Sequence, residues 1–76
     1  MTLGRAIRNA REDAGLSQET VATRARIGRS YLSLLENEAK SPTVKVLLRI
    51  CAAIGVSAAD VLRQVEEGSA PRNRRD

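Results

Sequence analysis

Five stretches of the chain carry apolar residues at intervals of three and four, the spacing of one face of an α-helix. The other positions of these stretches are mostly polar or charged, and no segment alternates as a half-buried strand does. The apolar sets are Leu3, Ile7, Ala10 and Ala14; Val21, Ala22 and Ala25; Ile27, Tyr31, Leu32 and Leu35; Leu47, Leu48, Cys51 and Ile54; and Val61, Leu62 and Val65. The pattern predicts an all-α domain of five short helices.

Residues that start and stop helices mark the boundaries. Gly15 and Gly55 are expected to end helices, because glycine readily adopts the left-handed conformation found there. The expected N-caps are Ser17, Thr43, Ser57 and, more weakly, Gly28. We therefore expect helices at 3–14, 18–25, 29 to 36 or 37, 44–54, and from 58 onward. Residues 1–67 are assigned to the domain and residues 68–76 to a flexible basic tail.

The composition of the 76 residues limits the chemistry that the domain can perform. The chain has no histidine and a single cysteine, which excludes the usual zinc sets, the Cys-His and Ser-His nucleophile pairs and an internal disulfide. Tyr31 is the only aromatic residue, so a rigid aromatic pocket is not expected. We predict no enzyme, cofactor or metal, and we interpret Cys51 as a core residue of the fourth helix and not as a redox sensor.

Basic residues outnumber acidic ones by thirteen to nine, and the net charge of +4 favours a polyanionic partner. Arg72, Arg74 and Arg75 lie in the tail, where they either add salt-sensitive affinity for nucleic acid or are inert. The longest apolar run, ICAAIGV, is far shorter than the roughly 20 residues that span a bilayer, and no secretion signal is visible. We expect a cytoplasmic protein that binds no membrane.

The segment LSQETVATRARIGRSYLSLLENEAKSPTVKVLLRICAAIGVSAADVL, residues 16–62, resembles the helix-turn-helix domain of the lambda-repressor-like, Xre-type regulators. This resemblance implies a compact five-helix fold whose second and third helices form the helix-turn-helix, with the third in the DNA major groove. Small family members include phage Cro-type repressors and restriction-modification controller proteins. The triplet Arg29-Ser30-Tyr31 is similar to that of the controllers. The other matching positions are Leu16 to Glu19, Ala22, Leu32, Ser33, Glu36, Asn37, Pro42 and Ala53 to Ser57.

The chain departs from the family pattern at the turn between these two helices. Arg26 stands where the family commonly has glycine, and Gly28 stands where it commonly has serine or threonine. A residue other than glycine with positive φ costs about 1 kcal/mol or more, so we expect a strained or differently shaped turn.

The third helix is expected to read base edges. Arg29 and Ser30 would lie in its first turn, and Ser33 one turn later. The helix dipole disfavours an arginine there, but the same side chain can make a bidentate contact with guanine O6 and N7. Leu34 corresponds to a base-contacting position of related phage repressors, and it either touches a thymine methyl or packs inside the domain.

Helix starts and the loop after the third helix are expected to bind the DNA backbone, since free N–H groups attract phosphates. Tyr31 either donates its hydroxyl to a phosphate or is a core residue with an exposed tip. Arg24 and Arg26 are either backbone contacts or solvated surface arginines. The expected phosphate contacts are Gln18, Arg26, Tyr31, Asn37, Lys40, Ser41 and Thr43.

Two further sets have supporting roles. The family resemblance implies a largely buried ion pair between Arg11 and Glu36 that orients the third helix. Apolar residues around the fifth helix either form a homodimer surface or close the core of the monomer; these are Val56, Ala59, Val61, Leu62 and Val65.

These observations predict a transcription regulator that binds double-stranded DNA. A homodimer would place two copies of the third helix about 34–36 Å apart on a palindromic operator. Acidic surface residues would be available to RNA polymerase. The alternative is an antitoxin-type module that binds a protein partner as well as DNA, using the basic tail.

Overall fold

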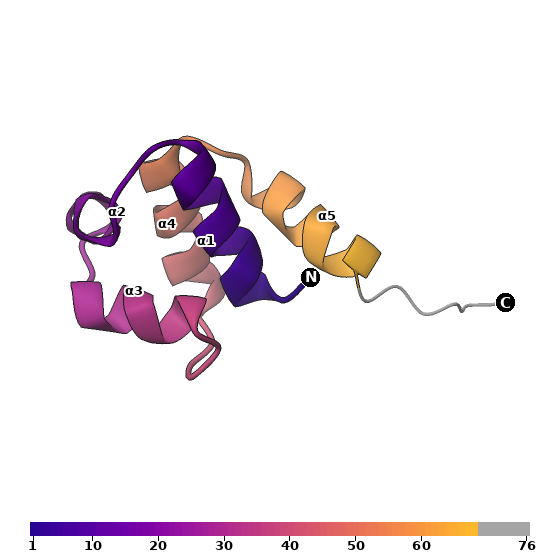
Figure 1. Ribbon diagram of the computed structural model, residues 1–76, viewed down its shortest axis with the longest axis horizontal. Coiled ribbons are helices and arrows are strands. Elements are labelled where there is room, and N and C mark those ends of the chain that lie inside the picture. Colours follow the sequence, from indigo (N-terminus) through magenta and orange to yellow (C-terminus); the bar gives the residue numbers. More distant parts are fainter. Residues whose placement is uncertain (69–76) are drawn as a thin grey trace, which may run out of the picture.

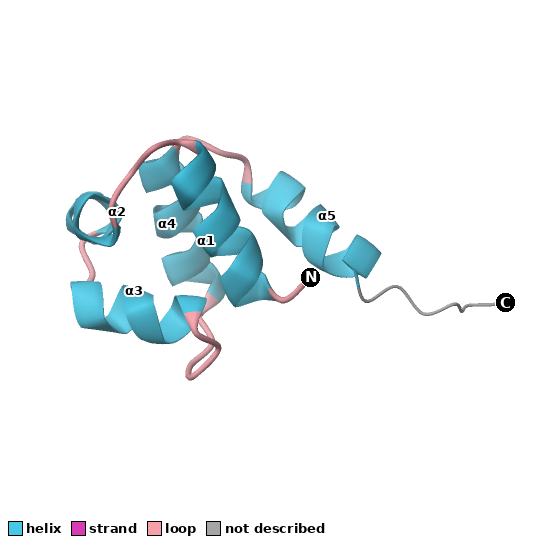
Figure 2. Ribbon diagram, viewed as in Figure 1, coloured by secondary structure: helices cyan, strands magenta, loops and turns pink. Residues whose placement is uncertain are grey.

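The computed structural model describes residues 1–68, and all regular structure within that range is α-helical (Figures 1 and 2). The helices are α1 (Leu3–Asp13), α2 (Gln18–Ala25), α3 (Arg29–Glu36), α4 (Val44–Ile54) and α5 (Ala58–Gly68). The predicted five-helix fold is therefore confirmed. Gly68, which the sequence analysis assigned to the tail, is the last residue of α5, and the rest of the predicted tail lies outside the described residues.

Side-chain caps precede every helix except α3. Thr2, Ser17 and Thr43 each accept a hydrogen bond through the hydroxyl oxygen from the N–H three residues later, at 3.1–3.3 Å. Ser57 accepts one at 3.1 Å from the N–H two residues later. Gly28 has no side chain to offer, so the first turn of α3 keeps uncapped N–H groups. The uncapped start of α3 is relevant to ligand binding, because free N–H groups at a helix start attract anions.

Four helices are followed within two residues by a residue with positive φ, and after each the next N–H donates to a carbonyl five residues earlier, at 2.9–3.1 Å. Two of these turns use glycine, which adopts the conformation freely, and two use a charged residue at a cost of about 1 kcal/mol. The positive φ expected at Arg26 is thus present. The residues are Gly15 (72°), Arg26 (62°), Glu38 (66°) and Gly55 (92°).

The hydrophobic core draws side chains from all five helices. In Figure 1, α1 crosses in front of α4, with α2 and α3 at one end of the molecule and α5 at the other. Two leucines of the predicted apolar sets are exposed, Leu48 by 53% and Leu62 by 44%. The buried faces of their helices run instead through the neighbouring Leu47 and Val61. Ala14 is also exposed, since α1 ends one residue before it.

Candidate nucleic-acid interface

Helix α3 presents one continuous face to the outside. Arg29, Ser30 and Leu34 are exposed, and Ser33 is half-buried between them. At 100° per residue these positions share an arc of about 140°, and the buried residues of the helix lie on the other side. All four expected base-contacting residues therefore point outward together. Leu34, for which two interpretations were open, is 39% exposed and is not packed inside the domain.

The start of α3 is open as well as uncapped. Gly28 is exposed, and a Cβ placed on it would meet no atom within 4 Å. Arg29 follows directly, and among residues 1–68 its guanidinium has no hydrogen-bond or ion-pair partner. A cation and a set of free N–H donors therefore stand together at one exposed helix end.

The loop that follows α3 carries a second polar surface. Asn37, Lys40 and Ser41 are exposed, as expected for backbone contacts. Thr43 is exposed too, but its hydroxyl oxygen already accepts the hydrogen bond that caps α4, at 3.1 Å. Its hydroxyl hydrogen is left for another acceptor.

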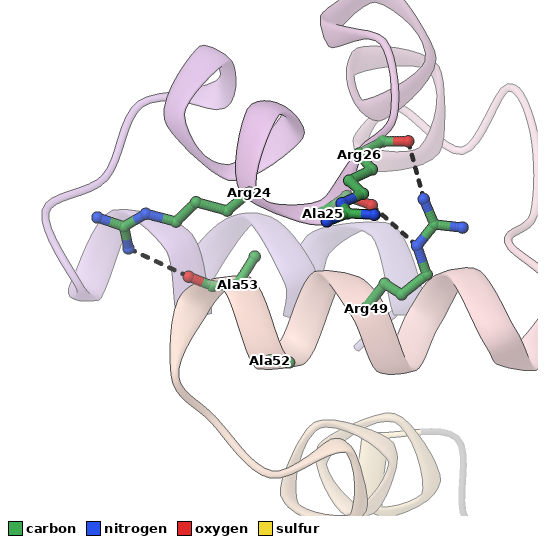
Figure 3. Close-up of a pocket in the computed structure, with 6 residues that line it drawn as sticks. All are labelled: Arg24, Ala25, Arg26, Arg49, Ala52 and Ala53. Carbon is green, nitrogen blue, oxygen red and sulfur yellow. Dashed lines mark hydrogen bonds between the residues drawn. The ribbon is translucent and has the colours of Figure 1, made fainter.

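Three other expected phosphate contacts are placed differently from the loop residues. Gln18 Nε2 donates to Glu36 Oε1 at 3.0 Å, so part of its amide supports the domain internally. Tyr31 is half-buried and packs against the core. Arg26 is exposed, at the strained turn, and its side chain lines a groove beside Arg49 (Figure 3).

An ion pair joins α1 to the end of α3. Arg11 Nε and Nη2 donate to the two carboxylate oxygens of Glu36 at 2.7 and 3.0 Å. Both side chains are buried, with 10% and 1% exposed. The hydrogen bond with Glu36 raises the pKa of Arg11, so the arginine stays charged. With the Gln18 amide, the carboxylate accepts three hydrogen bonds, the satisfaction that a buried charge requires.

A second contact at this end of α3 was not expected from the sequence. The Glu38 carboxylate accepts a hydrogen bond from the N–H of Gly4, in the first turn of α1. Gly4 is buried, and a Cβ there would lie 2.7 Å from the Glu36 carbonyl and closer still to the Leu35 carbonyl. The available signal was a glycine inside a helical pattern, which can indicate a close approach of backbones.

The turn before α3 is held through its backbone (Figure 3). Arg49, on α4, donates from Nε to the Ala25 carbonyl at 2.9 Å and from Nη2 to the Arg26 carbonyl at 2.8 Å. Arg24 Nη1 donates to the Ala53 carbonyl at 3.3 Å. These carbonyls lie at the C-terminal ends of α2 and α4, where the helix dipole favours cations. Arg24 and Arg49 therefore act as helix caps. The sequence analysis did not single out Arg49, and the one feature that could have drawn attention to it is that it is a charged residue within the most apolar helix.

The predicted dimer set divides between core and surface. Val61, for which both interpretations were open, is 2% exposed and closes the core of the monomer. Val56 and Val65 are half-buried and pack against the core. Ala59 and Leu62 are exposed on α5. The structure thus leaves a smaller apolar surface than the sequence indicated.

The described residues were also searched for a reactive thiol, a metal site and a membrane-spanning helix. Cys51 is buried, and burial raises the pKa of its thiol, so the thiol stays protonated. Within residues 1–68 no three metal-binding side chains gather. In the same part of the chain, every helix is too short or too polar to cross a membrane.

Comparison with known proteins identifies the family to which this fold belongs. Residues 7–61 match the family described as helix-turn-helix. The chain belongs to this family. It is 37% identical over 57 residues to the uncharacterized HTH-type transcriptional regulator y4dJ of Sinorhizobium fredii, and the match covers 75% of this chain and 74% of that protein.

Two solved helix-turn-helix structures extend the likeness to three dimensions. The clp gene regulator ClgR of Corynebacterium glutamicum superimposes with a TM-score of 0.83 at 37% identity, over 93% of this chain and 91% of that one. The master regulator for biofilm formation SinR, solved in complex with DNA, gives a TM-score of 0.75 at 29% identity, over 80% and 98%. The chain is thus a lambda-repressor-like helix-turn-helix domain of DNA-binding transcription regulators.

Proposed function

We propose that this protein is a sequence-specific transcription regulator that binds a palindromic operator as a homodimer, with α2 and α3 as its helix-turn-helix. The observation that carries the proposal is the outward face of α3, where four side chains suited to base contacts lie together and two of them stand at an uncapped helix start. A single exposed helix fits the major groove, which is about 12 Å wide. The DNA-bound SinR structure supports DNA as the partner.

Arg29 is the proposed principal base reader. Its guanidinium is exposed and unpaired among the described residues, and it can contact guanine O6 and N7 together. Such a contact contributes about 1–3 kcal/mol of discrimination. Ser30 and Ser33 add weaker hydrogen bonds, and the exposed Leu34 provides an apolar contact for a thymine methyl. A cation at the start of α3 is thus useful because this end faces polyanionic DNA.

The DNA backbone contacts are proposed to come mainly from the loop after α3. Asn37, Lys40 and Ser41 are exposed there, next to the reading face. Thr43 adds its hydroxyl hydrogen at the start of α4. These contacts fix the register of the domain on the duplex without reading sequence.

Gln18, Tyr31 and Arg26 are proposed as secondary backbone contacts. The Gln18 amide has a second N–H beyond the one that Glu36 accepts. The hydroxyl tip of the half-buried Tyr31 and the exposed guanidinium of Arg26 can each reach a phosphate only from the edge of the interface.

The homodimer is proposed to use α5, because a single α3 reads only a few base pairs. Leu62 and Ala59 are the exposed apolar residues there, flanked by the half-buried Val56 and Val65. The proposed dimer works in the cytoplasm, where RNA polymerase can meet it on the operator.

Selection of binding sites from random duplex DNA, at two salt concentrations, tests the proposal. We expect wild type to enrich a palindrome containing guanine at a fixed position. Arg29→Ala should relax the preference at that position while other positions remain selected. Arg8→Ala is the matched control, because Arg8 lies on α1, outside the residues proposed for DNA binding and for the dimer, and pairs with Glu12. Binding that is salt-sensitive but blind to sequence in the wild type would contradict the proposal.

A further inference from the structure

The loop after α3 begins with a backbone conformation that glutamate adopts reluctantly. Glu38 has φ of 66°, in the left-handed region. The turn closes through hydrogen bonds from Glu38 N to the Leu35 carbonyl at 3.2 Å and from Ala39 N to the Leu34 carbonyl at 2.9 Å. Glycine would make the same turn without strain. Glu38 adopts this strained conformation at a position where its side chain makes a contact with another helix.

That contact is the hydrogen bond from the N–H of Gly4 to the Glu38 carboxylate. It spans 34 positions of sequence and joins the loop after α3 to the start of α1. A negative charge at a helix start is favoured by the dipole of that helix. Because Gly4 has no Cβ, its backbone can approach the carbonyls of Leu35 and Glu36 as well. Glu38 thus fastens the loop to a buried and closely packed point of the domain.

The fastened loop is the one that carries the proposed backbone contacts. Asn37 immediately precedes Glu38, and Lys40 and Ser41 follow within three residues, all exposed. The backbone of the loop also makes a hydrogen bond from Lys40 N to the Leu34 carbonyl, which is long at 3.3 Å. Among residues 1–68, the side-chain contact of Glu38 is the hydrogen bond that joins the loop to another helix.

We propose that Glu38 is a positioning residue for DNA binding, which holds Asn37, Lys40 and Ser41 in place against the DNA backbone through its bond to Gly4. This inference rests on the proposed function. It has an unusual consequence, because the side chain that organises the contacts carries the same sign of charge as DNA. Removing an acidic group beside a DNA-binding surface strengthens binding by electrostatics alone. Positioning predicts the opposite sign.

Affinity for the selected duplex is measured for Glu38→Gln, Glu38→Ala and Glu38→Gly at several salt concentrations. Glu38→Ala is expected to bind about fivefold to tenfold more weakly than wild type. The slope of log affinity against log salt should become shallower by about two, the signature of one lost phosphate contact in each subunit of the proposed dimer. Glu38→Gln keeps an acceptor oxygen for the Gly4 N–H and should recover most of the affinity.

Glu38→Gly separates positioning from stability. Glycine relieves the positive φ but removes the carboxylate, so this variant should be at least as stable as Glu38→Ala while binding DNA equally weakly. Glu67→Gln, at an exposed position near the end of α5, controls for the loss of one negative charge and should bind as wild type or slightly more tightly.

Two results would overturn the inference. One is Glu38→Ala binding as tightly as wild type or more tightly, with an unchanged or steeper salt slope. The other is affinity that follows stability across the three variants. If wild type itself selects no sequence, the proposed function fails instead, and the two failures are therefore distinguishable.

Discussion

The two ends of α3 are secured in different ways. At the end of the helix, Glu36 and Glu38 reach α1 through a buried bidentate ion pair and a contact with a glycine that has no room for a side chain. At its start, the strained turn is closed by its own backbone hydrogen bonds, and the side chain that reaches it from another helix is the half-exposed Arg49, which contacts backbone carbonyls. The buried end fixes the axis of the helix, and the open end leaves Arg29 free for a partner.

The largest effect is expected from breaking the ion pair. Glu36→Ala should lower the free energy of unfolding by about 3–5 kcal/mol, because it leaves the charged Arg11 in a buried site without its bidentate partner. Urea denaturation followed by circular dichroism measures this loss. Replacing both partners, Arg11→Met with Glu36→Leu, should recover most of it. A double variant as unstable as the single one would show that the pair has no such role.

A smaller loss is expected where α1 meets the end of α3. Gly4→Ala should destabilise the domain by about 1–3 kcal/mol, although alanine favours helix, because its Cβ overlaps two carbonyls. Gly28→Ala is the matched control. Its Cβ meets open space at a φ of −75°, so thermal unfolding should show only the loss of less than about 1 kcal/mol that alanine costs relative to glycine at an N-cap. Equal effects of the two substitutions would refute the close-packing argument.

At the start of α3, Arg49→Met should cost about 1–2 kcal/mol, since two carbonyls at the end of α2 lose a charged donor while the apolar stem is kept. The same denaturation measurement applies. Arg63→Met, which removes only an exposed pair with Asp60, should change stability by less than about 0.5 kcal/mol. A loss no larger than this control would mean that the turn does not depend on Arg49.

The smallest effect is expected from Arg26→Gly, which should increase the free energy of unfolding. Glycine relieves a φ of 62° and leaves the Arg26 carbonyl available to Arg49, so stability should rise by up to about 1 kcal/mol. DNA affinity should fall slightly if Arg26 contacts a phosphate. A destabilised variant would show that the turn carries no strain for glycine to relieve.

Local sequence signals were sufficient to predict the helices and most of the core residues. Caps such as Ser17 and Thr43, and the glycines at 15 and 55, set boundaries that depend on only a few neighbouring residues. Leu48 was misplaced because an apolar stripe wider than the buried face cannot tell which edge stays exposed. For the same reason the sequence left both interpretations open for Leu62, which is exposed, and for Val61, which is buried.

The contacts that hold α3 required information that periodicity does not contain. The Gly4–Glu38 and Ala25–Arg49 pairs are 34 and 24 residues apart, and no local pattern links their partners. The pairing of Arg11 with Glu36, 25 residues apart, was expected only through family resemblance. The outward face of α3 was more accessible to prediction, because three of its residues follow directly from where the helix begins.

A double-mutant cycle between protein and DNA tests the central claim that Arg29 reads a guanine from the open end of α3. The selected duplex is compared with one in which 7-deazaguanine replaces that guanine, which removes N7 but keeps base pairing. Wild type should lose at least fivefold in affinity, of the order expected for part of a 1–3 kcal/mol contact, and Arg29→Ala should lose almost nothing. Equal losses for both proteins would contradict the claim, because the base would then be read by another residue.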